Sequence, residues 1–315
     1  MNANNFDPKT VASFGDEWSR FDQSGMSEEE AENVFREYFA VFPWGNLPAD
    51  AEGFDMGCGS GRWARWVAPR VGRLHCIDPS AAVEVAIKNL QVLKNVEFHR
   101  AFVDEPQIQP NSQDFGYSLG VLHHVPDTAA AIQSCVALLK PGAPLLLYLY
   151  YAFDNRPAWF RALWRVSDGF RRIVHRLPAG LKHIVTDTIA ATVYWPLARL
   201  SGALEELGLG VHGIPLSYYR KHTFYTMRTD ARDRFGTPLE QRFTRVQIDS
   251  MMRAAGLIEI RFSEEAPYWC AVGLKDIAPV VTNPLKSVLA RSNNQQLAAE
   301  PPLARNSLDR RVETQ

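Results

Sequence analysis

The chain has 315 residues, so it is either one large domain with insertions or two domains, since a typical domain has about 150 residues. Hydrophobic residues make up 46% and charged residues 22% of the sequence, which excludes a disordered or collagen-like chain. With 34 basic and 35 acidic residues the net charge is −1, which excludes a globally basic nucleic-acid-binding protein.

The four cysteines, at positions 58, 76, 135 and 270, are too far apart for a CxxC pair or a zinc-binding spacing, so we expect no metal site. Such sparse use of cysteine favours a reducing compartment, most simply the cytoplasm. The first 30 residues contain no basic start followed by an apolar run, so we expect no signal peptide. The longest apolar stretch, 143–153, is about half of the roughly 20 residues that a membrane helix needs. We interpret it as a buried strand.

Charge is distributed unevenly, which indicates separate parts. Residues 1–50 hold ten acidic and three basic residues, whereas residues 152–245 hold fifteen basic and eight acidic ones. The predicted divisions are a helical cap at 1–50, a central α/β domain at 51–275 with a helical insertion at 152–243, and a tail at 276–315 that we expect to be largely disordered, above all at 293–315.

The acidic N-terminal part is predicted to be helical. Ser27 and Glu30 form an S-x-x-E capping box, apolar residues follow at helical spacing, and Pro43 ends the helix. Before it, Phe14, Trp18 and Phe21 lie on one face of a short helix. These aromatic side chains either pack on the next domain or also line a ligand pocket.

The central part alternates short apolar runs with amphipathic stretches. Strands are predicted at 53–57, 74–77, 96–102, 115–119 and 144–151, and helices at 62–71, 81–93 and 128–139, the last with Asp127 as its N-cap. Strands that alternate with helices of this length indicate βαβ units and a parallel sheet covered on both faces.

The basic insertion interrupts this alternation. We predict a helix at 159–177 with a break at Gly169, a helix at 184–207 interrupted at Pro196, a long ordered loop at 215–243, and then a helix at 245–255 and strands at 257–262 and 268–274. The 159–177 helix carries aromatic residues on one side and arginines between them. It is either a lid that meets the acceptor or a membrane surface, or an ordinary surface helix with a solvated arginine face.

The segment FDMGCGSGR, residues 54–62, joins a strand to a helix through a glycine turn. Such a turn lets the backbone approach a ligand closely at a helix N-terminus. Gly57 and Gly59 fit the first two positions of the dinucleotide motif G-x-G-x-x-G/A, but Arg62 stands at the third and Gly61 comes one residue early. Together with the absence of a Tyr-x-x-x-Lys pair, this argues against a nicotinamide or flavin enzyme.

Two further segments lie where a ligand of this turn is expected. Asp78 ends the next strand and is placed to accept the hydroxyls of a ribose, or else to cap the helix after Pro79. The loop GVLHHVPDT, residues 120–128, follows the fourth strand and contains His123 and His124. Either histidine is a candidate site residue or a packing or capping residue.

In this order, the segments DMGCGSG, IDPS, GVLHHVPD and LLKPGAPLLLYLY resemble the class I S-adenosylmethionine-dependent methyltransferases, specifically the small-molecule, type 11-like members with a helical insertion after the fifth strand. The resemblance covers residues 52–151 and 244–275. It implies S-adenosyl-L-methionine as cofactor and an α/β, doubly wound, Rossmann-like sheet of seven strands in the order 3-2-1-4-5-7-6, with strand 7 antiparallel.

The resemblance also implies a set of cofactor-binding residues. The methionine and ribose part is assigned to Asp55, Gly57, Cys58, Gly59, Ser60 and Gly61, the ribose hydroxyls to Asp78, the adenine to Val103 and Asp104, and the sulfonium side to Leu119, Gly120 and Val121. The adenine region departs from the family pattern, because Phe102 stands where many members have an acidic or small polar residue.

Methyl transfer is an in-line displacement on an activated carbon. The enzyme therefore contributes chiefly by aligning the acceptor with the methyl group and by excluding water. A general base is needed only for an acceptor that is protonated at neutral pH, and His123 and His124 are the candidates. Other residues that we expect to line an acceptor pocket are Tyr150, Tyr151, Tyr218, Tyr219 and His222.

We therefore expect methyl transfer to the oxygen, nitrogen or carbon of a small, apolar or lipid-like molecule, with peripheral membrane contact through 159–177. The alternative is a non-catalytic S-adenosylmethionine-binding or regulatory protein. A nucleic-acid acceptor is not expected, since no N/D-P-P-Y/F motif follows the fourth strand. The oligomeric state stays open.

Overall fold

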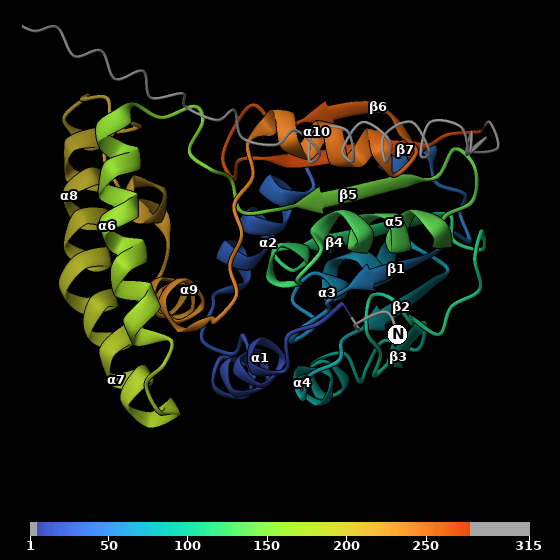
Figure 1. Ribbon diagram of the computed structural model, residues 1–315, viewed down its shortest axis with the longest axis horizontal. Coiled ribbons are helices and arrows are strands. Elements are labelled where there is room, and N and C mark those ends of the chain that lie inside the picture. Colours follow the sequence, from blue (N-terminus) through green and yellow to red (C-terminus); the bar gives the residue numbers. More distant parts are fainter. Residues whose placement is uncertain (1–4, 278–315) are drawn as a thin grey trace, which may run out of the picture. The chain divides into compact units, whose positions relative to one another are not determined.

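The computed structural model describes residues 5–277, so the tail expected at 276–315 lies outside the described residues from position 278 onward. A seven-stranded sheet runs through this part in the order β3-β2-β1-β4-β5-β7-β6 (Figure 1). Its strands are β1 (Glu52–Met56), β2 (Arg73–Ile77), β3 (Val96–His99), β4 (Phe115–Leu119), β5 (Pro144–Tyr148), β6 (Leu257–Phe262) and β7 (Cys270–Lys275). Only β7 pairs antiparallel, with β5 and β6, so the predicted strand order and orientation are confirmed.

Helices cover both faces of the sheet. The α-helices are α1 (Pro8–Arg20), α2 (Glu28–Tyr38), α3 (Ala64–Val67), α4 (Ala82–Asn89), α5 (Thr128–Leu138), α6 (Ala158–Val174), α7 (Ala179–Ile189), α8 (Trp195–Glu206), α9 (Phe224–Gly236) and α10 (Arg245–Ala254). One core joins the sheet to α5 and α10, and a second core joins the other face to α2, α3 and α4. Continuous apolar runs form the central strands because both of their faces are buried. Within the described range, no helix is long and apolar enough to cross a membrane.

The insertion is more helical than predicted. The expected loop at 215–243 is wrong, because it contains a short 3-10 helix, η5 (Ser217–Lys221), and the 13-residue helix α9. Thr223 caps α9, whose buried positions include the polar Thr226, Thr229 and Arg232. The buried apolar residues Met227, Ala231 and Phe235 recur at helical spacing, but the buried polar positions on the same helix obscure the pattern by which helices are found in sequences.

Helix α6 also differs from its prediction. It continues through Gly169 without a break. Arg171 does not belong to a solvated arginine face, because its guanidinium is buried, bonds Asp168 at 2.7 Å and donates to the carbonyl of Thr237 at 3.1 Å. After α7, the π-helical turn η4 (Ala190–Tyr194) leads into α8, and Pro196 lies in the first turn of α8, where its missing N–H is tolerated.

The N-terminal helices contact the insertion directly. Ser27 accepts the Glu30 N–H as an N-cap, but the Glu30 carboxylate bonds Thr223 N and Thr226 Oγ1 at 3.0 and 2.7 Å, not the Ser27 N–H of a capping box. Arg232 of α9 donates to Asp16 of α1 at 2.8 Å. Elements about 200 positions apart therefore share one set of polar contacts.

Candidate active site

The glycine turn after β1 requires glycine at specific positions. Gly57, Gly59 and Gly61 have φ values of +83°, +52° and +79°, in the left-handed region. A Cβ at Gly57 would lie 2.4 Å from a methyl carbon of Val121, and one at Gly61 would lie 2.8 Å from Leu90. The turn therefore packs closely against Val121 and Leu90. Gly57 and Gly59 also border a cavity, where they have no side chain of their own to cover the backbone.

One cavity of about 800 Å³ lies beside this turn and the carboxyl ends of β1, β2, β4 and β5. Helix α1 contributes Phe14 and Trp18 to its wall, so these aromatic side chains do line a pocket. The insertion contributes residues from α6, η4, α8, η5 and α9. Figure 1 shows the insertion helices beyond the carboxyl end of β5.

Asp78 holds the glycine turn in place. Its Oδ2 accepts the Gly59 N–H at 2.9 Å, and its Oδ1 accepts the N–H and the hydroxyl of Ser80 at 2.9 and 2.6 Å. Asp78 does not cap the following helix, since α4 has no side-chain cap and Ser80 Oγ accepts the Ala82 N–H. Burial raises the pKa of Asp78, and its carboxyl lines the cavity.

The predicted cofactor-binding residues fall into two groups. Those that line the cavity are Gly57, Cys58, Gly59, Ser60, Asp78, Val103, Leu119, Gly120 and Val121. The cavity walls in the described part of the chain do not include Asp55, Gly61 or Asp104.

Each of these last positions has a different environment. Asp55 is fully buried among sheet residues, and burial raises its pKa well above the usual value. Asp104 is exposed and accepts the Asn5 N–H at 3.1 Å. Near the predicted adenine position, Phe102 stacks on Phe6 with ring centroids 4.1 Å apart, and both rings line the cavity.

The adjacent histidines differ in environment. His123 is fully buried and stacks on Tyr150, neither of its ring nitrogens has a hydrogen-bond partner among residues 5–277, and burial lowers its pKa well below the usual value. His124 lines the cavity and donates from Nδ1 to the Leu239 carbonyl at 2.6 Å. Its Nε2 therefore carries the lone pair, and it lies 3.8 Å from Asp233 Oδ1.

Three acidic residues that the sequence reasoning missed also line the cavity: Glu17 of α1 and Asp230 and Asp233 of α9. Glu17 is 1% exposed, and burial followed by the charge of Asp233 raises its pKa well above normal. Asp230 accepts the Tyr219 hydroxyl at 2.8 Å, and burial raises its pKa to about 6. Asp233 accepts the Tyr150 hydroxyl. The spacing of Asp230 and Asp233 on one helix face was the available signal, but that segment was expected to be a loop.

The predicted acceptor-pocket residues divide similarly. Tyr150, Tyr151, Tyr218 and Tyr219 line the cavity. His222 is buried behind Tyr218, whose ring centroid is 4.5 Å away, and it is not part of the cavity wall in the described residues. The cavity thus combines a glycine turn, titratable groups on several elements, and aromatic walls.

Comparison with known proteins finds a family similarity for the segment that spans β1 to β5. Residues 54–147 match the family model described as "Methyltransferase domain". The chain is 33% identical over 138 residues to the ubiquinone biosynthesis O-methyltransferase of Xanthomonas euvesicatoria, covering 43% of this chain and 55% of that protein. It is 26% identical over 167 residues to the protein of the same name from Sodalis glossinidius, covering 51% and 64%. The match therefore spans less than two thirds of these relatives.

Among solved structures, the chain is similar to the phosphoethanolamine N-methyltransferase 2 of Haemonchus contortus. The two are 16% identical with a TM-score of 0.44, over 92% of this chain and 51% of the other.

Proposed function

The chain carries a class I S-adenosylmethionine-dependent methyltransferase domain, and we propose that the whole protein transfers a methyl group from that cofactor to a hydroxyl of an apolar small molecule. One observation carries the proposal. A single continuous cavity is lined by the glycine turn and Asp78, by His124 and buried carboxyls, and by apolar side chains of α6 and η4.

The residues at the glycine turn fit the cofactor. The positive φ angles of Gly57 and Gly59 leave bare backbone beside the cavity, and the partly used carboxylate of Asp78 suits a ribose hydroxyl. When bound, S-adenosylmethionine supplies a methyl group on a sulfonium centre that is already activated for displacement. The chain's own residues then have to align the acceptor, exclude water and remove a proton.

His124 is the proposed proton acceptor. A hydroxyl is protonated at neutral pH, so its methylation needs a base. The tautomer fixed by the Leu239 carbonyl leaves the lone pair on Nε2 of His124, a buried nitrogen without a hydrogen-bond partner among residues 5–277, and Asp233 at 3.8 Å would stabilise the resulting imidazolium. His123 is buried too but does not belong to the cavity wall in the described residues, which favours a packing role for it.

The acceptor is proposed to be apolar because of the far wall of the cavity. Leu163, Val166 and Phe170 of α6 and Val193 of η4 line it. Apolar walls with few polar groups are typical of sites for hydrophobic ligands. The names of the two O-methyltransferase relatives agree with a hydroxyl acceptor.

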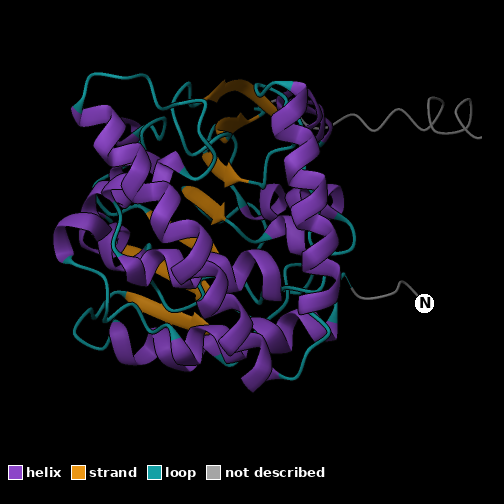
Figure 2. Ribbon diagram, turned by 90° about the vertical axis from the view of Figure 1, so that its left-hand side faces the viewer, coloured by secondary structure: helices purple, strands orange, loops and turns teal. Residues whose placement is uncertain are grey.

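We further propose that the insertion forms a lid that contacts a membrane. The apolar side chains at the cavity wall are also exposed, by 50% for Leu163, 61% for Val166 and 61% for Phe170. Figure 2 looks onto this helical side of the molecule. Exposed arginines lie among these positions, namely Arg161, Arg165 and Arg172 of α6 and Arg176 just after it. Large exposed apolar residues flanked by arginines suit an anionic bilayer surface. A cytoplasmic leaflet is proposed, since all four cysteines are buried and unpaired.

The catalytic proposal is tested with tritiated-methyl S-adenosylmethionine and two probes, catechol and 4-octylcatechol. We expect label on both catechols and a lower KM for the octyl compound. Binding of S-adenosylhomocysteine in calorimetry, with label on neither probe, would favour the binding-only alternative. It would contradict the proposed methyl transfer to such hydroxyl acceptors.

The membrane proposal is tested by co-sedimentation with phosphatidylglycerol vesicles. Phe170→Glu places a charge in the exposed apolar face and should abolish binding. Val246→Glu is the matched control, because Val246 is 76% exposed on α10 and belongs neither to α6 nor to the cavity wall in the described residues. Equal binding of both variants and the wild type would contradict the proposed contact.

A further inference from the structure

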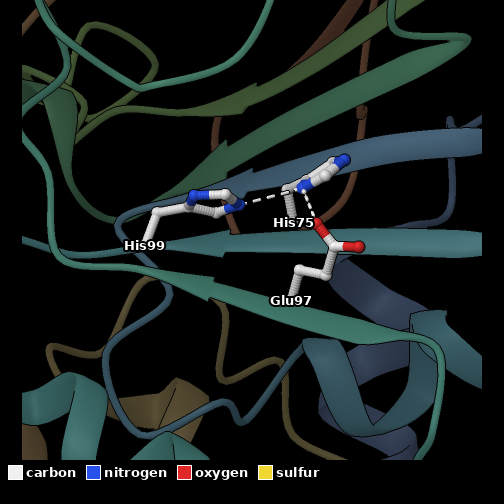
Figure 3. Close-up of side chains that lie close together, drawn as sticks. All are labelled: His75, Glu97 and His99. Atoms are coloured by element: carbon white, nitrogen blue, oxygen red, sulfur yellow. Dashed lines mark hydrogen bonds and ion pairs between the residues drawn. The ribbon is translucent and has the colours of Figure 1, made fainter.

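A second group of chemistry-bearing side chains lies on β2 and β3, and none of them belongs to the walls of the cavity in the described residues. Figure 3 shows His75 of β2 with Glu97 and His99 of β3. His75 Nδ1 lies 2.9 Å from His99 Nε2 and 3.4 Å from Glu97 Oε2. One atom of each of these side chains lies within 4.8 Å of the other two.

The strand register produces this arrangement. Glu97 and His99 are two positions apart on one strand, so their side chains point to the same face of the sheet. In the parallel pairing of β2 with β3, His75 lies opposite Glu97 and Ile77 lies opposite His99. The imidazole of His75 therefore meets both side chains of the neighbouring strand on that face.

Glu52 of β1 orients the central histidine. Its Oε1 accepts a hydrogen bond from His75 Nε2 at 2.8 Å and another from Gln113 Nε2 at 3.3 Å. With the proton of His75 on Nε2, Nδ1 accepts the hydrogen bond from His99 Nε2, so metal binding requires the proton of His99 to move to its Nδ1. A carboxylate behind a histidine in this way is the usual outer partner of a metal-binding imidazole.

We propose that His75 Nδ1, His99 Nε2 and Glu97 Oε2 bind a divalent transition metal ion, with Zn²⁺ as the best match. Two imidazoles and a carboxylate are a zinc-type ligand set, whereas Mg²⁺ and Ca²⁺ prefer oxygen ligands. Ligands of a tetrahedral zinc ion are about 3.3 Å apart, so the two separations from His75 Nδ1, 2.9 and 3.4 Å, need to change by a few tenths of an ångström. The separation between the Glu97 and His99 ligand atoms, which is within 4.8 Å, has to come to the same value.

The remaining contacts leave room for the ion. Arg73 binds the other Glu97 oxygen, Oε1, at 3.0 Å, so Oε2 stays available. Glu97 is exposed, so water can complete the coordination. The ion would join β2 to the edge strand β3, and these strands lead directly to Asp78 and Phe102. This proposal differs from our expectation of no metal site, which considered cysteine spacing and not cross-strand histidines.

The test uses the full chain without a histidine tag, stripped with a chelator and then titrated with Zn²⁺ in a calorimeter. We expect one site per chain in the wild type and at least tenfold weaker binding in His99→Ala and in Glu97→Ala. Glu52→Gln should weaken binding by about 10- to 100-fold, since it removes the outer carboxylate. His212→Ala is the matched control, because His212 is exposed and lies outside the cluster.

Co²⁺ absorption and thermal unfolding provide readouts that are independent of methyl transfer. The wild type should give the visible bands of four-coordinate Co²⁺ and unfold at a higher temperature with Zn²⁺, and His99→Ala should do neither. The variants alter half-buried or exposed side chains, and circular dichroism checks that they fold. The proposal is overturned if the wild type does not bind Zn²⁺, or if His99→Ala and Glu97→Ala bind it as the wild type does.

Discussion

Replacing Asp78 by alanine removes the acceptor that connects the glycine turn to the cofactor site. A carboxylate offers about four acceptor positions. Gly59 N, Ser80 N and Ser80 Oγ occupy three of them, so one remains for a ribose hydroxyl unless the Ser80 hydroxyl turns away. One hydrogen bond to a charged acceptor contributes about 1.5–3 kcal/mol. With some loosening of the turn, we expect a loss of about 2–3 kcal/mol of binding free energy, which is roughly a 30- to 150-fold higher Kd.

Calorimetry with S-adenosylhomocysteine measures this change. Ser80→Ala should bind nearly as tightly as the wild type, because it keeps the Asp78 carboxylate. Asp114→Ala is the matched control for stability: Asp114 accepts the Glu52 N–H at 3.0 Å and Lys140 Nζ at 2.7 Å, outside the cavity wall. It should lower the unfolding temperature without changing the Kd. A Kd for Asp78→Ala equal to that of the wild type would refute the reasoning.

Three further changes test the site. His124→Ala should lose methyl-transfer turnover at unchanged S-adenosylhomocysteine affinity, whereas His123→Ala should mainly lower the unfolding temperature; equal full activity of both would remove His124 from the proposed role. Gly57→Ala should weaken cofactor binding at least tenfold, because its Cβ would lie 2.4 Å from Val121 at a φ of +83°, and a normal Kd would contradict this. Since burial raises the pKa of Asp230 from 3.8 to about 6, the folded state binds the extra proton, and the contribution of Asp230 to stability should fall as the pH rises from about 4 to about 6. Asp230→Asn should lose less over that range in thermal unfolding, and identical pH profiles would argue against the raised pKa.

The sheet could be predicted because its strands are buried on both faces. Phe115–Leu119 and Pro144–Tyr148 are continuous apolar or small-residue runs, and the glycine turn marks the end of β1. Helix α9 was missed because polar residues such as Thr226 and Arg232 occupy buried positions beside its short apolar row of Met227, Ala231 and Phe235.

The cavity was predictable only in part. Residues of the glycine turn and Asp78 follow strand ends, so their proximity follows from topology. Glu17 and Asp233 come from helices more than 200 positions apart, and no local pattern pairs them. His123 and His124 are neighbours in sequence, and only the three-dimensional turn Leu122–His124 separates a packing environment from a cavity environment.

The contacts between the N-terminal helices and α9 have a consequence for biosynthesis. Asp16 and Glu30 leave the ribosome long before Arg232 and Thr226, their partners, which lie 216 and 196 positions later in the chain. At about 5–20 residues per second, the delay is on the order of 10–40 seconds. During that time Asp16 and Glu30 lack their partners, and Phe21 lacks Tyr225 of α9, whose ring centroid lies 5.8 Å from its own. Early folding intermediates of this protein should therefore be incompletely packed at their N-terminal end. They should bind chaperones until α9 has been synthesised.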